Sequence, residues 1–296
     1  MSSADETGNG APAPAAVPER KRVAVILSGC GNRDGSEIRE SLFTMLALER
    51  ANVEILFFAP DKPGPVVMNH LTGEPSADEP VRNVLVEAAR IARGKIAALS
   101  TLDPATVDAA IFPGGLGAGK VLSNFLEKGA ICDVDPEVTR TIRALFTAHK
   151  PLGFICLAPI LAARILGPLA GVRITLGPRG TTAAKHAAVM GADVRPCLAT
   201  DIVIDENARV VTTPAYMCED VTLPQILQGI EKLVRSVVHL TRQPKHQPGQ
   251  RPRNPRSNEN DQRAGRGPVP PNRPRESVQV RRRGNRPGAT PGRGSA

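Results

Sequence analysis

Cys156 is the residue of this chain best placed for covalent chemistry. It lies between an apolar run at 152–155 and Pro159, so an expected strand turns directly into an expected helix. A cysteine at such a corner resembles a nucleophile elbow, and the dipole of the following helix favours the thiolate. The pattern is not G-x-C-x-G, because Phe154 and Ala158 replace the glycines. The alternative is an inert buried thiol, the commoner state of a cysteine among apolar neighbours.

A second loop whose residues could take part in chemistry spans residues 28–37. Its three glycines follow the first apolar run in the pattern G-x-G-x-x-x-G, which is similar to a dinucleotide-binding fingerprint. Asp34 and Glu37 would then place carboxylates where phosphates bind, which disfavours a nucleotide site. Glu37 stands in the first turn of an expected helix, beside a strand end. It could serve a site there, or it could only cap the helix.

The third loop covers residues 113–121. It matches G-x-x-x-x-G-K but continues with Val121, where a phosphate-binding loop needs Ser or Thr for Mg²⁺. This departure disfavours an ATPase. Gly114 and Gly115, directly after a strand, instead expose backbone N–H groups that could approach a developing oxyanion.

The elements that must position these loops alternate between apolar strands and amphipathic helices. Strands are expected at 22–28, 53–59, 108–112 and 152–155, a β-hairpin at 202–213, and helices at 36–51, 81–92, from 135, after 156 and at 222–241. Near-continuous apolar strands of this kind predict a mostly parallel sheet covered on both faces, with ligands at the carboxyl ends of the strands. The three loops lie at those ends.

One helix face can be predicted in more detail. In the helix at 36–51, we expect the apolar side chains near one face to turn toward the core. They are Ile38, Leu42, Met45, Leu46 and Leu48.

Composition divides the chain into three parts. Residues 1–20 and 243–296 lack apolar periodicity, and the latter hold ten of the 28 prolines, so both are expected to be flexible extensions. From residue 241 onward there are 14 Lys and Arg against three Asp and Glu, whereas the whole chain carries +9. The basic tail could bind nucleic acid weakly and without sequence preference, or it could only solubilise the 21–242 domain.

Several classes of protein are disfavoured by composition. The five cysteines form no C-x-x-C pair and the five histidines are scattered, so neither a disulfide framework nor a zinc site is expected. The most apolar stretch, 153–167, contains an arginine and a proline and is too short to span a membrane. A reducing, cytoplasmic location is predicted.

Longer motifs recur together in one family. They are ILSGCG (26–31), DGSEI (34–38), NHLTGE (69–74), RNVL (82–85), PGG (113–115), KPLGF (150–154) and VTTPAYM (211–217). Over about 22–242 the chain resembles the ElbB family (isoprenoid-biosynthesis-associated, sigma cross-reacting protein type) of the ThiJ/PfpI, class I glutamine amidotransferase-like superfamily. The resemblance implies an α/β, flavodoxin-like three-layer sandwich: a mostly parallel sheet with a small β-hairpin.

The resemblance also implies an activity and a set of site residues. ElbB-like proteins act as glutathione-independent glyoxalases that convert glyoxal to glycolate, with methylglyoxal to lactate and deglycation as related reactions, and they need no cofactor or metal. Superfamily members commonly form homodimers. Carried over by motif, Cys156 is the nucleophile, Glu37 the acid beside it, and the N–H groups of Gly115 and Leu157 the oxyanion hole. The remaining pocket residues would be Gly114, Cys30, Asn69 and His70.

The histidines separate this chain from the hydrolytic relatives. Amidotransferases and PfpI-type peptidases have a histidine paired with the cysteine. Here Leu157 follows Cys156 and none of the five histidines falls in a recognisable triad motif, which disfavours glutamine hydrolysis and proteolysis. His186 is expected to be solvated, and His70 could line the pocket or stabilise its loop. A lyase of the glyoxalase type is therefore the leading hypothesis. The alternative from another class is a non-catalytic redox or stress-response protein with Cys156 as a sensor thiol.

Overall fold

The sheet of this protein has seven strands in the order β3-β2-β1-β4-β5-β9-β8. The computed structural model describes residues 20–76 and 78–243, so the predicted extensions lie outside the described residues except at Arg20 and Gln243. All neighbouring strands run parallel except the β8–β9 hairpin. The strands are β1 (Arg22–Ile26), β2 (Glu54–Ala59), β3 (Ile96–Ala98), β4 (Ala109–Phe112), β5 (Leu152–Ile155), β8 (Val203–Asp205) and β9 (Val210–Thr213).

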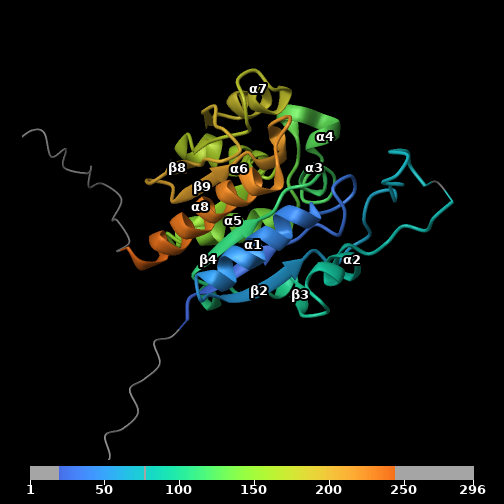
Figure 1. Ribbon diagram of the computed structural model, residues 1–296, viewed down its shortest axis with the longest axis horizontal. Helices are drawn as coiled ribbons and strands as arrows, with labels where there is room; N and C mark the ends of the chain where they lie inside the picture. The colour runs from blue at the N-terminus through green and yellow to red at the C-terminus, as the bar shows by residue number, and fades with distance from the viewer. Residues whose placement is uncertain (1–19, 77, 244–296) are drawn as a thin grey trace, which may run out of the picture. The chain divides into compact units, whose positions relative to one another are not determined.

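Helices cover both faces of this sheet. In Figure 1, α1 and α8 lie in front of it and α5 and α6 lie behind it. These helices are α1 (Ile38–Arg50), α5 (Pro136–Thr147), α6 (Pro159–Ala170) and α8 (Leu223–Arg242), while α2 (Val84–Ile91) packs against β2 and β3. The prediction of a flavodoxin-like three-layer sandwich with a mostly parallel sheet and a small hairpin is confirmed.

Smaller elements lie beside the main sheet, and the strands and helices expected from the sequence pattern did not include them. They are α3 (Gly117–Lys120), α4 (Phe125–Lys128), α7 (Thr182–Val189), the two-stranded sheet β6 (Arg173–Ile174) and β7 (Asp193–Val194), and the 3₁₀ turn η4 (Ala215–Met217). Figure 1 shows α3 beside the loop that leads into α1. Two backbone bonds fix this contact: Leu116 N–H donates to Asn32 O at 2.7 Å, and Gly117 N–H to Gly35 O at 3.0 Å.

The buried face of α1 differs from the one predicted. Ile38 and Leu42 are 50% and 55% exposed, whereas Glu40, Ser41 and Thr44 are completely buried. The polar groups are tolerated because the hydroxyls bond back to the helix: Thr44 Oγ1 donates to the carbonyl of Glu40 at 2.7 Å, and Ser41 Oγ likewise to that of residue 37. The first half of α1 therefore turns a polar face inward.

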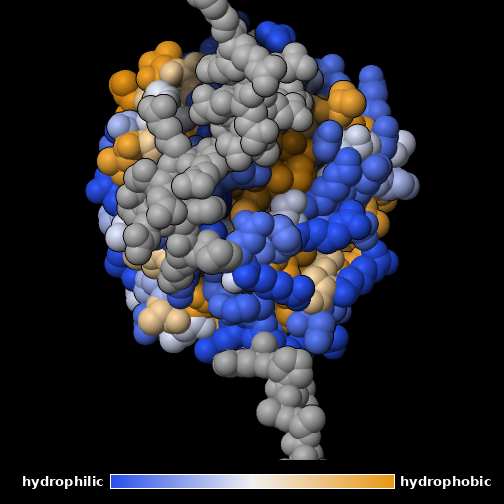
Figure 2. Space-filling model, turned by 90° about the vertical axis from the view of Figure 1, so that its left-hand side faces the viewer, coloured by the Kyte–Doolittle hydropathy of each residue, from blue (hydrophilic) through white to orange (hydrophobic). Residues whose placement is uncertain are grey.

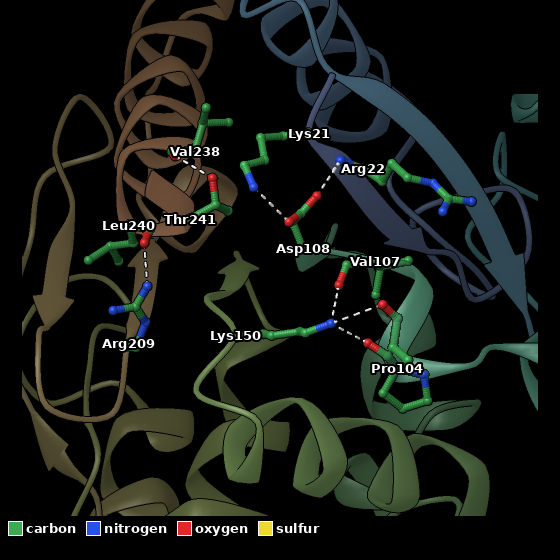
Figure 3. A network of polar contacts seen from close by, with 11 residues as sticks. Lys21, Arg22, Pro104, Val107, Asp108, Lys150, Arg209, Val238, Leu240 and Thr241 are labelled. Atoms are coloured by element: carbon green, nitrogen blue, oxygen red, sulfur yellow. Dashed lines mark hydrogen bonds and ion pairs between the residues drawn. The ribbon is translucent and has the colours of Figure 1, made fainter. Parts of the chain in front are cut away.

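The amino ends of the strands are closed by a polar network (Figure 3). Asp108, just before β4, accepts hydrogen bonds from Lys21 Nζ and from the N–H of Arg22, both at 2.9 Å. Lys150, just before β5, donates to the carbonyls of Pro104 and Val107 at 2.5 Å. These contacts tie strand ends together on the edge opposite the three glycine-containing loops, which leaves that other edge for a site.

In the part of the chain that the structure describes, no helix is both long and apolar enough to cross a bilayer. On the face seen in Figure 2, hydrophobic residues form patches interrupted by hydrophilic ones.

Candidate active site around Cys156

Cys156 lies on a strained turn between β5 and α6. Its φ of +60° is in the left-handed region, which non-glycine residues seldom adopt. The turn is held by a backbone bond from Cys156 N–H to Thr213 O at 2.9 Å, and the side chain is 8% exposed. Strained residues of this kind concentrate at functional sites. The structure thus has the elbow that the sequence pattern predicts.

Two backbone N–H groups lie beside the sulfur. Those of Gly115 and Leu157 are close enough to the thiol of Cys156 to lower its pKa. Gly115 reaches this position because its φ is +98° and its α-carbon lies against the loop before α1. An added Cβ would meet the N of Glu37 at 2.6 Å, so only glycine fits. The two N–H groups predicted as an oxyanion hole therefore lie together beside the thiol.

The acid in contact with Cys156 is Glu40. Its carboxyl lies beside the thiol, close enough for the two groups to perturb each other's pKa, and the backbone N–H of Tyr216 lowers the pKa of this carboxyl. Oε2 accepts from Gly114 N–H at 2.9 Å, whereas Oε1 is buried without a well-formed hydrogen bond. Gly114 is enclosed between the two groups: an added Cβ would lie 2.6 Å from Glu40 Oε2 and also clash with Cys156 Cβ.

Glu37 is the N-cap of α1 and does not contact the thiol by a hydrogen bond. Its Oε2 accepts from the N–H of Glu40 at 2.7 Å, and its own N–H donates to Gly114 O at 2.9 Å. The structure therefore corrects the sequence-based placement of Glu37 as the acid beside the cysteine. Glu40 was missed because acids are seldom buried, although it leads a stripe of small residues on α1 (Ser41, Thr44 and Ala47) that could have indicated an inward face.

Burial and charge perturb both members of the pair. Burial, followed by the nearby charge of Glu37, raises the pKa of Glu40 to about 8. Burial also raises the pKa of Cys156 well above its usual value, and a charged Glu40 raises it further, while the N–H groups of Gly115 and Leu157 lower it. Both groups therefore hold their protons at pH 7, so the thiolate that the helix dipole was expected to favour is not the resting form, and the thiol needs a base when it reacts. The pair titrates as one coupled unit.

The thiol opens into a cavity of about 710 Å³. Among the predicted residues, Cys156, Glu37, Gly115 and Leu157 line it. Further lining residues not expected from the sequence include Arg39, Leu116, Phe125, Leu126, His186, Tyr216 and Met217. His186, expected to be solvated, lines this cavity from α7, its ring edge-on to Phe125 at a centroid distance of 5.7 Å.

Three other predicted pocket residues belong to a different cavity. Cys30, Asn69 and His70 line a separate space of about 350 Å³ on the other side of the 28–37 loop, so the prediction that they share the Cys156 pocket is corrected. His70 Nε2 accepts from the N–H of Arg33 at 3.3 Å and lies 3.7 Å from Asp34. The loop-stabilising interpretation of His70 fits these contacts.

The described residues contain no cluster of three or more His, Cys, Asp and Glu side chains arranged to hold a metal ion. What the site offers is a thiol, a carboxyl of perturbed pKa and two inward N–H groups. These parts are suited to nucleophilic addition and proton transfer.

A parallel sheet with a cysteine elbow, a buried acid against it and paired glycines beside it defines a class I glutamine amidotransferase-like protein. The chain belongs to the family of the ES1 proteins. It is 44% identical over 230 residues to the ES1 protein homolog, mitochondrial, of Rattus norvegicus, which covers 75% of this chain and 85% of the relative. The human glutamine amidotransferase-like class 1 domain-containing protein 3, mitochondrial, is also 44% identical, over 228 residues (74% and 83% covered).

A solved structure supports the same assignment. The isoprenoid biosynthesis protein with amidotransferase-like domain from Ehrlichia chaffeensis has a TM-score of 0.69 and 34% identity, covering 74% of this chain and 99% of that one. No model in a scan of protein families matches the chain. The superfamily inferred from the motifs is confirmed. The predicted cytoplasmic location is contradicted, because the curated relatives carry mitochondrial names.

Proposed function

We propose that this protein is a glutathione-independent, cofactor-free glyoxalase-like enzyme with Cys156 as nucleophile. The observation that carries the proposal is the contact between the buried Glu40 carboxyl and the thiol, at the floor of an open cavity and beside two inward N–H groups. An inert structural cysteine needs neither a strained backbone nor a buried acid.

In the first step, the sulfur of Cys156 adds to one aldehyde carbon of glyoxal. As the S–H bond breaks, its proton passes to Glu40 in its carboxylate form; a C–S bond forms, and the carbonyl electron pair becomes an oxyanion beside the N–H groups of Gly115 and Leu157. Glu40 then gives the proton to that oxygen, which yields the hemithioacetal and restores the carboxylate. The two N–H groups can stabilise the negative charge while it is on the oxygen.

In the second step, Glu40 moves a proton. As carboxylate it removes the hydrogen from the carbon bonded to sulfur, and as acid it returns a proton to the neighbouring carbon. The adduct becomes a thioester, which water cleaves to glycolate and the free thiol. A pKa of about 8 places the carboxyl near the working pH, where acid–base catalysis is most effective. Glu37 acts indirectly, by starting α1 and by raising the pKa of Glu40.

The redox-sensor alternative uses the same thiol. Oxidation of Cys156 to a sulfenate would place an oxygen near the Glu40 carboxyl, and no turnover would follow. The two functions are separated by product formation. Purified protein incubated with glyoxal, without glutathione or metal, is expected to release glycolate continuously with Cys156 unmodified, and Cys156→Ser is expected to release none.

Stable oxidation of Cys156 with no glycolate from wild type would contradict the enzyme and support the sensor. Membership of the ElbB branch itself remains a prediction. Methylglyoxal as substrate, deglycation, a homodimer and weak nucleic-acid binding by the basic tail remain predictions.

A further inference from the structure

The cavity above Cys156 is much larger than glyoxal. At about 710 Å³ it lies within the range of sites that bind drug-sized ligands, roughly 300–1,000 Å³. Glyoxal has four non-hydrogen atoms. Even the best small ligands gain no more than about 1.5 kcal/mol per such atom, so glyoxal could bind no tighter than about 40 μM and would leave most of the cavity empty.

The wall of the cavity is largely apolar. Phe125 and Leu126 from α4 line it together with Leu157 and Met217. Gly119 of α3 makes this wall continuous: it is so close to Leu126 and Leu157 that an added Cβ would lie 2.8 Å from one and 3.4 Å from the other. Leu126 stays 44% exposed although it packs here, which leaves apolar surface for a ligand to cover.

Polar groups are confined to part of the lining. Arg39 donates to the hydroxyl of Tyr216 at 3.1 Å and its guanidinium lies 6.0 Å from that ring. His186 is held edge-on to Phe125, with Nδ1 buried and unbonded among the described residues. Small apolar pockets with a few convergent polar groups bind ligands of matching polarity.

We infer that the carbonyl compound for which this site is built carries an apolar group of several carbons, which lies against Phe125, Leu126 and Leu157 while its carbonyl carbon reaches Cys156. The inference rests on the proposed function for the carbonyl chemistry. The apolar cavity can be tested without turnover, because any thiol-directed reagent must enter by the same route.

The test is a homologous series of N-alkylmaleimides, from methyl to hexyl, with labelling of each cysteine followed by peptide mapping. Burial of one methylene is worth about a fourfold change in an equilibrium or rate constant at most. The rate at Cys156 is expected to rise about two- to fourfold per methylene over the first few carbons. Cys30 provides an internal control, because it lines the separate, more polar cavity and its labelling rate is expected to be nearly independent of chain length.

Two variants locate the effect. Leu126→Gln is expected to reduce the chain-length dependence at Cys156, while Leu169→Gln, at a residue 60% exposed on α6 and outside the cavity, leaves it unchanged. A second arm compares acid formation from glyoxal and straight-chain 2-oxoaldehydes up to eight carbons, with kcat/KM expected to rise with length.

The outcomes distinguish the two claims. A flat maleimide series with glycolate still formed from glyoxal overturns the apolar-substrate inference and leaves the proposed function intact. A rising series with no acid from any 2-oxoaldehyde overturns the proposed function and keeps the apolar site. Equal slopes at Cys156 and Cys30 would show that the reagents respond to general hydrophobicity, which also overturns the inference.

Discussion

The carboxyl of Glu40 lies against the thiol of Cys156 with no surface of its own exposed to solvent. The two groups come from different elements that meet at the carboxyl edge of the sheet: Glu40 from helix α1, and Cys156 from the turn after β5. Since water cannot relay a proton to a fully buried carboxyl, its contacts with the thiol and with a molecule bound on that thiol determine what it can do.

Glu40→Gln is expected to separate addition from proton transfer. The amide keeps the size of the side chain but cannot exchange a proton, so glycolate formation is expected to fall about 10²–10⁴-fold. Glu37→Gln serves as the matched control, one helical turn away in the same cavity. It is expected to lose about 0.5–2 kcal/mol of stability through the weakened cap but less than tenfold in rate.

Near-normal turnover of a folded Glu40→Gln variant would exclude Glu40 as the proton shuttle. The opposite order, with Glu37→Gln the more damaging in rate, would restore the sequence-based assignment.

The stability of the protein is expected to depend on the titration of Glu40. Its pKa is about 8 in the folded state and near 4.5 when unfolded, so the folded state binds the proton more tightly. This group therefore stabilises the fold fully below pH 4.5, and its contribution is lost as the pH rises to 8, by at most about 1.4 kcal/mol per unit. Urea unfolding of wild type and Glu40→Gln at several pH values measures the difference, which should shrink to a constant above pH 8. A difference that is flat between pH 5 and 8 would mean that Glu40 is not perturbed.

Gly114 should tolerate no side chain. A Cβ there would clash with Cys156 and approach Glu40 Oε2 to 2.6 Å and Ile155 O to 2.9 Å. Gly114→Ala is expected to separate the carboxyl from the thiol, with a stability loss of about 1–3 kcal/mol for overpacking and a larger relative loss of turnover. Gly94→Ala is a useful comparison, because a Cβ at that exposed glycine meets nothing within 4 Å and only its positive φ opposes the change. Full activity of Gly114→Ala would show that the pair does not depend on this close approach.

A substitution of Asp108 provides the reverse test, because it is expected to lower the stability of the fold without changing catalysis. It joins Lys21 and the N–H of Arg22 at the amino edge of the sheet (Figure 3), whereas Cys156 follows β5 at the carboxyl edge. Asp108→Ala is expected to cost about 1–3 kcal/mol, since a partly buried backbone donor loses its partner. At a temperature where the variant stays folded, kcat/KM should equal that of wild type. A tenfold change in kcat/KM would mean that the two edges of the sheet are coupled.

The sequence was sufficient to predict most of the main strands and helices and the turn at Cys156, because these depend on local patterns. Apolar runs that end in glycine or cysteine identify parallel strands and their carboxyl ends, and these ends must meet at one edge. Short elements such as β3 have too few residues to show a pattern. Gly115 and Leu157 were placed beside Cys156 by the motifs shared with the ElbB family.

Glu40 and His186 could not be placed this way. Periodicity assigns apolar residues to the core, but the start of α1 lies over the site edge, where Glu40 faces inward and Ile38 outward. His186 arrives through tertiary packing of α7 on Phe125. Cys30 belongs to the 28–37 loop and His70 to the NHLTGE motif, yet both line the second cavity, and sequence motifs do not show on which side of a loop a side chain lies.

The left-handed turn at residue 156 bears on how this family can change over time. Glycine adopts such a backbone without the roughly 1–2 kcal/mol that a side chain costs there. Selection for a stable fold alone would therefore favour replacing this cysteine, and only its reactivity opposes that drift. A relative that carries glycine or asparagine at this position is therefore expected to keep the fold but to lack a covalent nucleophile, and this single residue identifies it.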